Sequence, residues 1–154
     1  MLPAMPVLRR AAAWLGAVRP GFLVVTLVTA ALGIAVAWAC GAPRDGPAAA
    51  ATLLLALLTH AAVNLYNDFG DHVGGSDAVN ADRVAPFTGG SRLIQDGVLG
   101  ARQVHDAALL LGLLVTGGGI LLAARAGPGL VVIGLAGLAL GWAYSSAGTS
   151  APRR

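Results

Sequence analysis

Polar side chains recur at helical spacing where a long apolar stretch of the sequence meets a charged segment. His60, Asn64, Asn67, Asp68 and Asp71 follow one another at intervals that place them on one face of a helix. Oxygen ligands without cysteine are typical of a site for a hard cation, and Mg²⁺ is usually held by a few carboxylates together with substrate phosphates. The spacing therefore predicts a magnesium site at the end of this helix.

Groups suited to binding an anion follow in the same charged segment. Arg83 comes directly after Asp82, and Arg92 closes a short run that contains the paired Gly89 and Gly90. The planar guanidinium group of arginine matches phosphate oxygens, and adjacent glycines let backbone N–H groups approach an anion. Acidic residues for a metal and arginines for phosphate, beside apolar stretches, predict a diphosphate with an apolar tail as the ligand.

The apolar stretches that must position these residues are long enough to cross a membrane. Apolar residues make up 56% of the 154 residues and charged residues only 11%, whereas soluble domains carry about 25% charged residues. A helix needs about 20 apolar residues to cross the bilayer core, and such spans are expected at residues 21–39, 49–68, 105–124 and 128–146. Because lipid offers no partners to backbone polar groups, the expected fold is an all-α polytopic membrane helix bundle.

The distribution of arginine predicts how this bundle is oriented in the cell inner (plasma) membrane. With the N-terminus in the cytoplasm, eight of the ten arginines lie inside and only Arg44 and Arg125 lie outside, which satisfies the positive-inside rule. Residues 7–19 then form an amphipathic lead-in on the inner face. Residues 69–104, between the second and third spans, form a long cytoplasmic active-site loop within a single membrane domain, residues 1–154.

The composition also excludes several other classes of site. A lone cysteine, Cys40, excludes a disulfide within the chain and a metal site with several cysteine ligands. The arginines flank apolar runs and form no basic stripe with interleaved aromatic residues, so no nucleic-acid partner is expected. The expected partners are the lipid bilayer and lipid-soluble substrates.

The run Asn64–Arg83 resembles the first Asp-rich motif of the UbiA superfamily of intramembrane prenyltransferases. That motif has an Asn, an Asp four residues later and another Asp a few residues beyond, which correspond to Asn67, Asp71 and Asp77, and Asp68 fits the common Asn-Asp form. The amino-acid sequence of this run is most similar to the 1,4-dihydroxy-2-naphthoate polyprenyltransferase branch. The stretch from residue 87 to residue 97 is similar to that branch as well, and the resemblance covers about residues 10–146.

The resemblance implies transfer of a polyprenyl group from a polyprenyl diphosphate to an aromatic acceptor, 1,4-dihydroxy-2-naphthoate in menaquinone biosynthesis, with Mg²⁺ as the cofactor. It implies that Asn67, Asp71 and Asp77 hold the metal and its diphosphate, with Asp68 assisting them as a catalytic residue. The residues expected to bind the substrate are Asn64, Arg83, Gly89, Gly90 and Arg92.

Departures from the family leave alternatives open. Full members have more spans and a second Asp-rich loop, so the chain is expected to be a truncated N-terminal half, and whether it is active alone is left open. A prenyltransferase with another aromatic acceptor and a non-catalytic four-helix membrane protein are the alternatives. At the level of single residues, Asp71 and Asp77 could be solvated, Arg83 and Arg92 could be membrane anchors, and His60 could form a helix–helix hydrogen bond.

Overall fold

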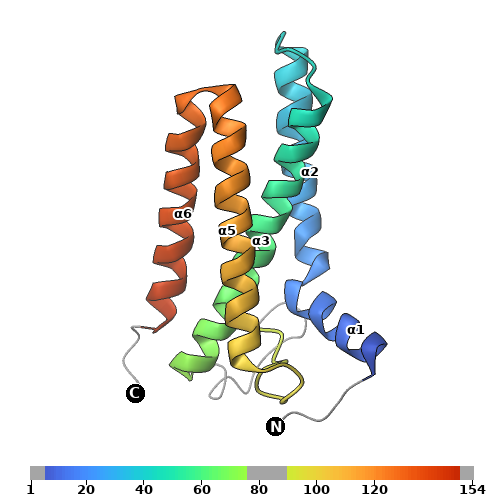
Figure 1. Ribbon diagram of the computed structural model, residues 1–154, viewed down its shortest axis with the longest axis vertical. Helices are drawn as coiled ribbons and strands as arrows, with labels where there is room; N and C mark the ends of the chain where they lie inside the picture. Colours follow the sequence, from blue (N-terminus) through green and yellow to red (C-terminus); the bar gives the residue numbers. More distant parts are fainter. Residues whose placement is uncertain (1–5, 76–89, 150–154) are drawn as a thin grey trace.

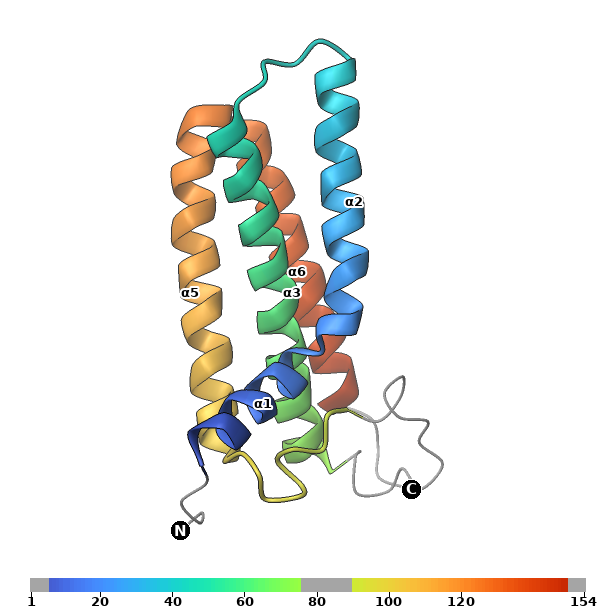
Figure 2. The same cartoon turned by 90° about the vertical axis from the view of Figure 1, so that its right-hand side faces the viewer.

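The computed structural model describes residues 6–75 and 90–149, and within them every regular element is a helix. In chain order the helices are α1 (Val7–Val18), α2 (Pro20–Ala39), α3 (Gly46–Gly74), α5 (Ala101–Ala126) and α6 (Pro128–Thr149). The last four run side by side as long rods, whereas α1 lies across one end of them (Figures 1 and 2). The predicted all-α bundle is confirmed.

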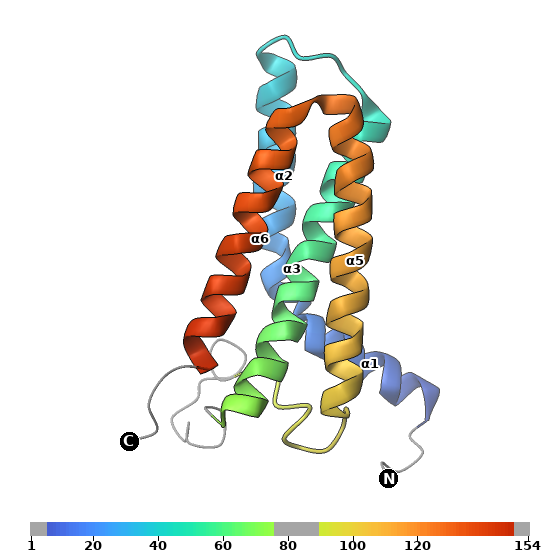
Figure 3. The ribbon, with the colours of Figure 1, turned by 60° about the vertical axis from the view of Figure 1, so that its left-hand side comes forward.

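Helix α3 is the centre of the bundle. It contacts each of the other four helices, most extensively α5, and Figure 3 shows it between α2 on one side and α5 on the other. Its first turn is fixed by Asp45, whose Oδ1 accepts a hydrogen bond from the backbone N–H of Ala48 at 2.9 Å, so one of the N–H groups left unpaired at a helix start is satisfied. Because α3 contacts every one of these helices, the packing of the bundle fixes where the side chains of α3 lie.

Among the residues that the structure describes, three helices are long and apolar enough to cross a membrane: α2, α3 and α5. The apolar stretch of α6, Gly129–Gly141, is shorter. None of the most apolar stretch of α2 is buried inside the protein, and only 17% of that stretch in α3 and 11% in α5 is buried. An apolar surface this extensive is unsuited to water but suits contact with lipid, so the chain has the properties of a membrane helix bundle.

The loop after α3 is shorter than the sequence suggests. Residues 69–104 were expected to be loop, but α3 continues to Gly74 and α5 begins at Ala101. Asp71 is therefore a helical residue. The helix ends where Gly75 adopts a left-handed conformation with φ of 72°, which glycine reaches without steric cost. The polar residues after residue 68 do not end the helix, because polar and charged side chains can be accommodated in the last turns of an α-helix.

Buried apolar side chains gather at the end of the bundle where α1 and residues 90–100 lie, which we call the loop end. The cluster joins α1, α3, the loop and α5, and its buried members are Ala13, Ala17, Leu65, Ile94, Leu99, Val104 and Ala108. Leu65 and Val104 are each only 1% exposed. The loop segment before α5 is therefore packed into the protein rather than lying free beside it.

A close approach of α3 and α5 gives a test of the packing. A Cβ atom added to Gly118 would lie 2.6 Å from Cδ2 of Leu55, closer than real contacts allow. We expect Gly118→Val to push the end of the Leu55 side chain aside and to destabilise the protein by at most about 1–3 kcal/mol through overpacking, measured as a shift in the unfolding midpoint in detergent. Gly117→Val and Gly119→Val are matched controls, because a Cβ at either position meets no atom within 4 Å. An equal loss in all three variants would show that this contact is not responsible.

Candidate functional site

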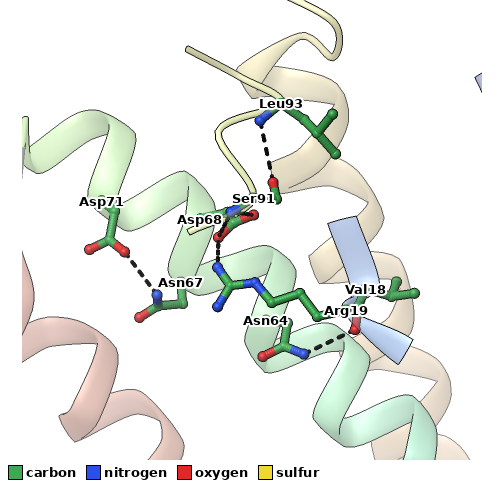
Figure 4. Close-up of polar contacts among 8 residues, drawn as sticks. All are labelled: Val18, Arg19, Asn64, Asn67, Asp68, Asp71, Ser91 and Leu93. Carbon is green, nitrogen blue, oxygen red and sulfur yellow. Dashed lines mark hydrogen bonds and ion pairs between the residues drawn. The ribbon is translucent and has the colours of Figure 1, made fainter. Parts of the chain in front are cut away.

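The polar face predicted from the sequence lies on the last turns of α3, at the loop end, and divides into two rows. Figure 4 shows Asn67 and Asp71 pointing to one side and Asn64 and Asp68 pointing toward the junction of α1 and α2. Each row joins residues four apart, which lie above one another on a helix, whereas adjacent residues are turned by about 100°. The two rows therefore meet different surroundings.

The first row is a pair of oxygen-bearing side chains. Nδ2 of Asn67 donates a hydrogen bond to Oδ2 of Asp71 at 2.9 Å, and both residues are partly buried. The contact orients the amide and the carboxylate toward each other across one helical turn (Figure 4). The structure thus brings together two of the three side chains that the sequence suggested as metal ligands. The third, Asp77, lies outside the described residues.

The second row begins with Asp68, whose side chain is only 4% exposed. It forms an ion pair with Nη2 of Arg19, and the backbone N–H of Ser91 points to its two oxygens at 3.4 and 3.3 Å. A buried carboxylate needs such partners, because burying a lone charge is costly. The sequence suggested that Asp68 assists in catalysis, and the structure places it between the α1–α2 junction and the loop.

Arg19 is the site residue that sequence reasoning missed, since it was counted only among the cytoplasmic arginines. It links α1 to α2 in a left-handed conformation with φ of 53°, and its side chain is only 21% exposed. Within the described residues its Nε atom is buried without a hydrogen-bond partner. The sequence feature that could have identified Arg19 is its position, directly before Pro20 and between an amphipathic segment and an apolar span.

Asn64 completes the second row. Its Nδ2 atom donates a hydrogen bond to the backbone carbonyl of Val18 at 3.0 Å. This carbonyl is in the last turn of α1, where backbone acceptors lack partners within the helix. The predicted role of Asn64 in binding substrate is not tested by this contact, which shows that its amide holds the end of α1 against α3.

The loop segment beside this row contains the remaining described candidates. Gly90 and Arg92 both have positive φ, of 66° and 57°, and the Nε atom of Arg92 lies 4.0 Å from Oδ1 of Asp96. The backbone N–H of Ser91 between them points to Asp68. The anion next to this part of the loop is therefore a side chain of the protein itself. Arg83 and Gly89, the other predicted substrate-binding residues, lie outside the described residues.

His60, one turn before this face, contributes to helix packing. Its Nδ1 atom lies 2.6 Å from Oγ1 of Thr26, which joins α3 to α2 by a hydrogen bond within the bundle. The helix–helix hydrogen bond that the sequence left open for His60 is confirmed.

The capacity of the site for a metal rests on the first row. Across residues 6–75 and 90–149, no three His, Cys, Asp or Glu side chains lie together as a metal-binding group. Asn67 and Asp71 offer one neutral and one charged oxygen ligand a helical turn apart. Such oxygen donors suit a hard cation that also retains waters and binds phosphate oxygens.

Comparison with known proteins gives one informative similarity. The chain is 34% identical over 117 residues to the 1,4-dihydroxy-2-naphthoate octaprenyltransferase of Escherichia coli (strain K12), a match that covers 76% of the chain and 36% of that enzyme. The chain thus spans little more than a third of the length of this curated relative. No protein-family model matches the chain, and no solved structure matches it. The similarity supports the resemblance to the UbiA superfamily, and the chain is a partial homologue of an octaprenyltransferase.

Proposed function

We propose that this chain binds the diphosphate of a polyprenyl donor at the cytoplasmic face of the inner membrane, for transfer of the polyprenyl group to an aromatic acceptor. The observation that carries the proposal is the Asn67–Asp71 pair at the end of a membrane-length helix. Its support comes from the partial homology to an octaprenyltransferase. The proposed acceptor is 1,4-dihydroxy-2-naphthoate, because this compound appears in the name of that relative.

The proposed metal is Mg²⁺, held by Asn67 and Asp71 with Asp77 as the third ligand. When bound, it neutralises the charge that develops on the departing diphosphate. Asn67 contributes to this site by orienting the carboxylate of Asp71 through the 2.9 Å hydrogen bond. Arg92 lies on the loop segment beside α3 and is proposed to bind phosphate oxygens. Its contact with Asp96 is long, at 4.0 Å, and partly exposed, so little is lost when a phosphate replaces it.

The apolar tail of the donor has a natural place along the bundle. Helices α2 and α5 expose long rows of apolar side chains. A diphosphate bound at Asn67 and Asp71 would leave its tail free to extend along these surfaces into lipid. The helices would then exclude water from the allylic carbon, where water would otherwise compete with the acceptor.

The direct test is binding of a polyprenyl diphosphate to the purified chain in detergent or in membranes. We expect saturable binding that requires Mg²⁺ and is reversed by a chelator. Adding 1,4-dihydroxy-2-naphthoate, 4-hydroxybenzoate or homogentisate in turn then shows which acceptor is prenylated, or which one alters donor binding. Absence of magnesium-dependent binding would contradict the proposal and favour a non-catalytic helical membrane protein.

A further inference from the structure

We infer that Arg19 is a positioning residue for the proposed diphosphate site, acting through Asp68 to fix the loop segment that carries Arg92. The consequence for substrate binding rests on the proposed function, whereas the structural link stands on the contacts alone. We call the link among Arg19, Asp68 and Ser91 the clasp.

The clasp joins three parts of the chain that are far apart in sequence. Arg19 lies 49 residues before Asp68, and Ser91 lies 23 residues after it. The guanidinium of Arg19 comes from the α1–α2 junction, the carboxylate from α3, and the N–H from the loop (Figure 4). One carboxylate therefore fixes the positions of two other segments relative to α3.

Burial makes this link more demanding than a surface ion pair. The side chain of Asp68 is 4% exposed and that of Arg19 is 21% exposed, so water cannot readily replace either partner. The Nε atom of Arg19 is also buried, with no hydrogen-bond partner in the described part of the chain. Loss of the arginine would leave the carboxylate with only the long contacts to Ser91, and we expect the loop to move so that water reaches it.

Two further contacts show that the clasp acts on α1 and the loop together. Asn64 holds the carbonyl of Val18, the residue directly before Arg19. Leu93 of the loop packs against the cluster that contains Ala13 and Ala17 of α1, and a Cβ atom placed on Gly16 would lie only 3.6 Å from its Cδ1. Arg92 lies between Ser91 and Leu93, so the backbone on both sides of it is held against the α1–α3 region.

The inference predicts a linked change in loop protection and ligand affinity. In Arg19→Ala we expect faster hydrogen exchange across residues 90–99. We also expect magnesium-dependent affinity for polyprenyl diphosphate to fall by roughly 10- to 100-fold, the scale on which misplacement of binding groups acts. Arg19→Lys keeps the charge and should recover part of both effects, whereas Arg19→Gln should not. The comparison of Lys with Gln remains informative if the alanine variant does not fold.

Arg102→Ala is the matched control, because Arg102 lies at the same end of the bundle, is 94% exposed and forms an ion pair with exposed Asp106 at 3.7 Å. Unchanged loop exchange in Arg19→Ala and Arg19→Gln would overturn the inference. Faster exchange with unchanged affinity would reduce the clasp to a structural contact and overturn the positioning role. If the unmodified chain binds no diphosphate, the proposed function fails and the positioning role fails with it, while loop exchange still decides whether the clasp exists.

Discussion

Asp71→Ala is expected to abolish magnesium-dependent binding of polyprenyl diphosphate. Removing an outer partner of a metal ligand lowers metal affinity roughly 10- to 100-fold, and removal of a charged ligand itself should exceed that loss. Asn67 would remain as a neutral oxygen ligand, which cannot offset the charge of the cation. The measurement is titration of the purified chain with labelled polyprenyl diphosphate at fixed Mg²⁺ concentration, followed by a magnesium titration at fixed ligand.

Asp106→Ala is the control for this experiment. Asp106 also lies at the loop end, on α5, and its side chain is 61% exposed beside Arg102. Its removal changes the net charge by the same amount as Asp71→Ala, so any general electrostatic effect on an anionic ligand appears in both variants. Equal affinities in the two variants would show that the carboxylate of Asp71 is not a metal ligand.

Asp68→Ala is expected to cause a large loss of stability. Removing one partner of a buried ion pair typically destabilises a protein by about 3–5 kcal/mol, because it leaves the other charge unpaired. Here the change would leave the guanidinium of Arg19 and the N–H of Ser91 without their shared acceptor. The measurement is the unfolding midpoint in mild detergent, converted to a free-energy difference.

Two comparisons separate this effect from a general sensitivity of the loop end. Asp106→Ala removes contacts of an exposed carboxylate with Arg102 and His105, which should cost no more than about 1 kcal/mol. The double variant Asp68→Ala with Arg19→Met removes both charges and should recover part of the loss, as replacement of buried ion pairs by apolar residues does. A loss in Asp68→Ala as small as that in Asp106→Ala would contradict the structural role of the pair.

The sequence alone predicted the features that depend only on residues close to one another along the chain. Apolar length predicted the helices, and helical spacing placed Asn67 and Asp71 side by side, as the structure shows. Both properties are local, since the hydrogen bonds of a helix and the contacts of residues four apart need no other part of the chain.

The features that the sequence did not reveal depend on distant segments. Helical spacing could not show that Asp68 pairs with Arg19, because the partner of each row is set by what packs against that side of α3. The end of α3 was placed too early because polar residues were taken as loop, whereas the helix ends at Gly75, in a left-handed conformation. Hydropathy alone reveals neither which residue pairs with Asp68 nor where α3 ends.

The separation of the clasp residues along the chain has a consequence for biosynthesis. Arg19 is translated 49 residues ahead of Asp68, and Ser91 follows another 23 residues later. Chains emerge from the ribosome N-terminus first, so α2 can enter the membrane while the arginine still lacks its acceptor on α3. The order of synthesis therefore lets insertion of α2 precede formation of the clasp, and a nascent chain halted before residue 68 would hold α1 through Asn64 without the ion pair of Arg19.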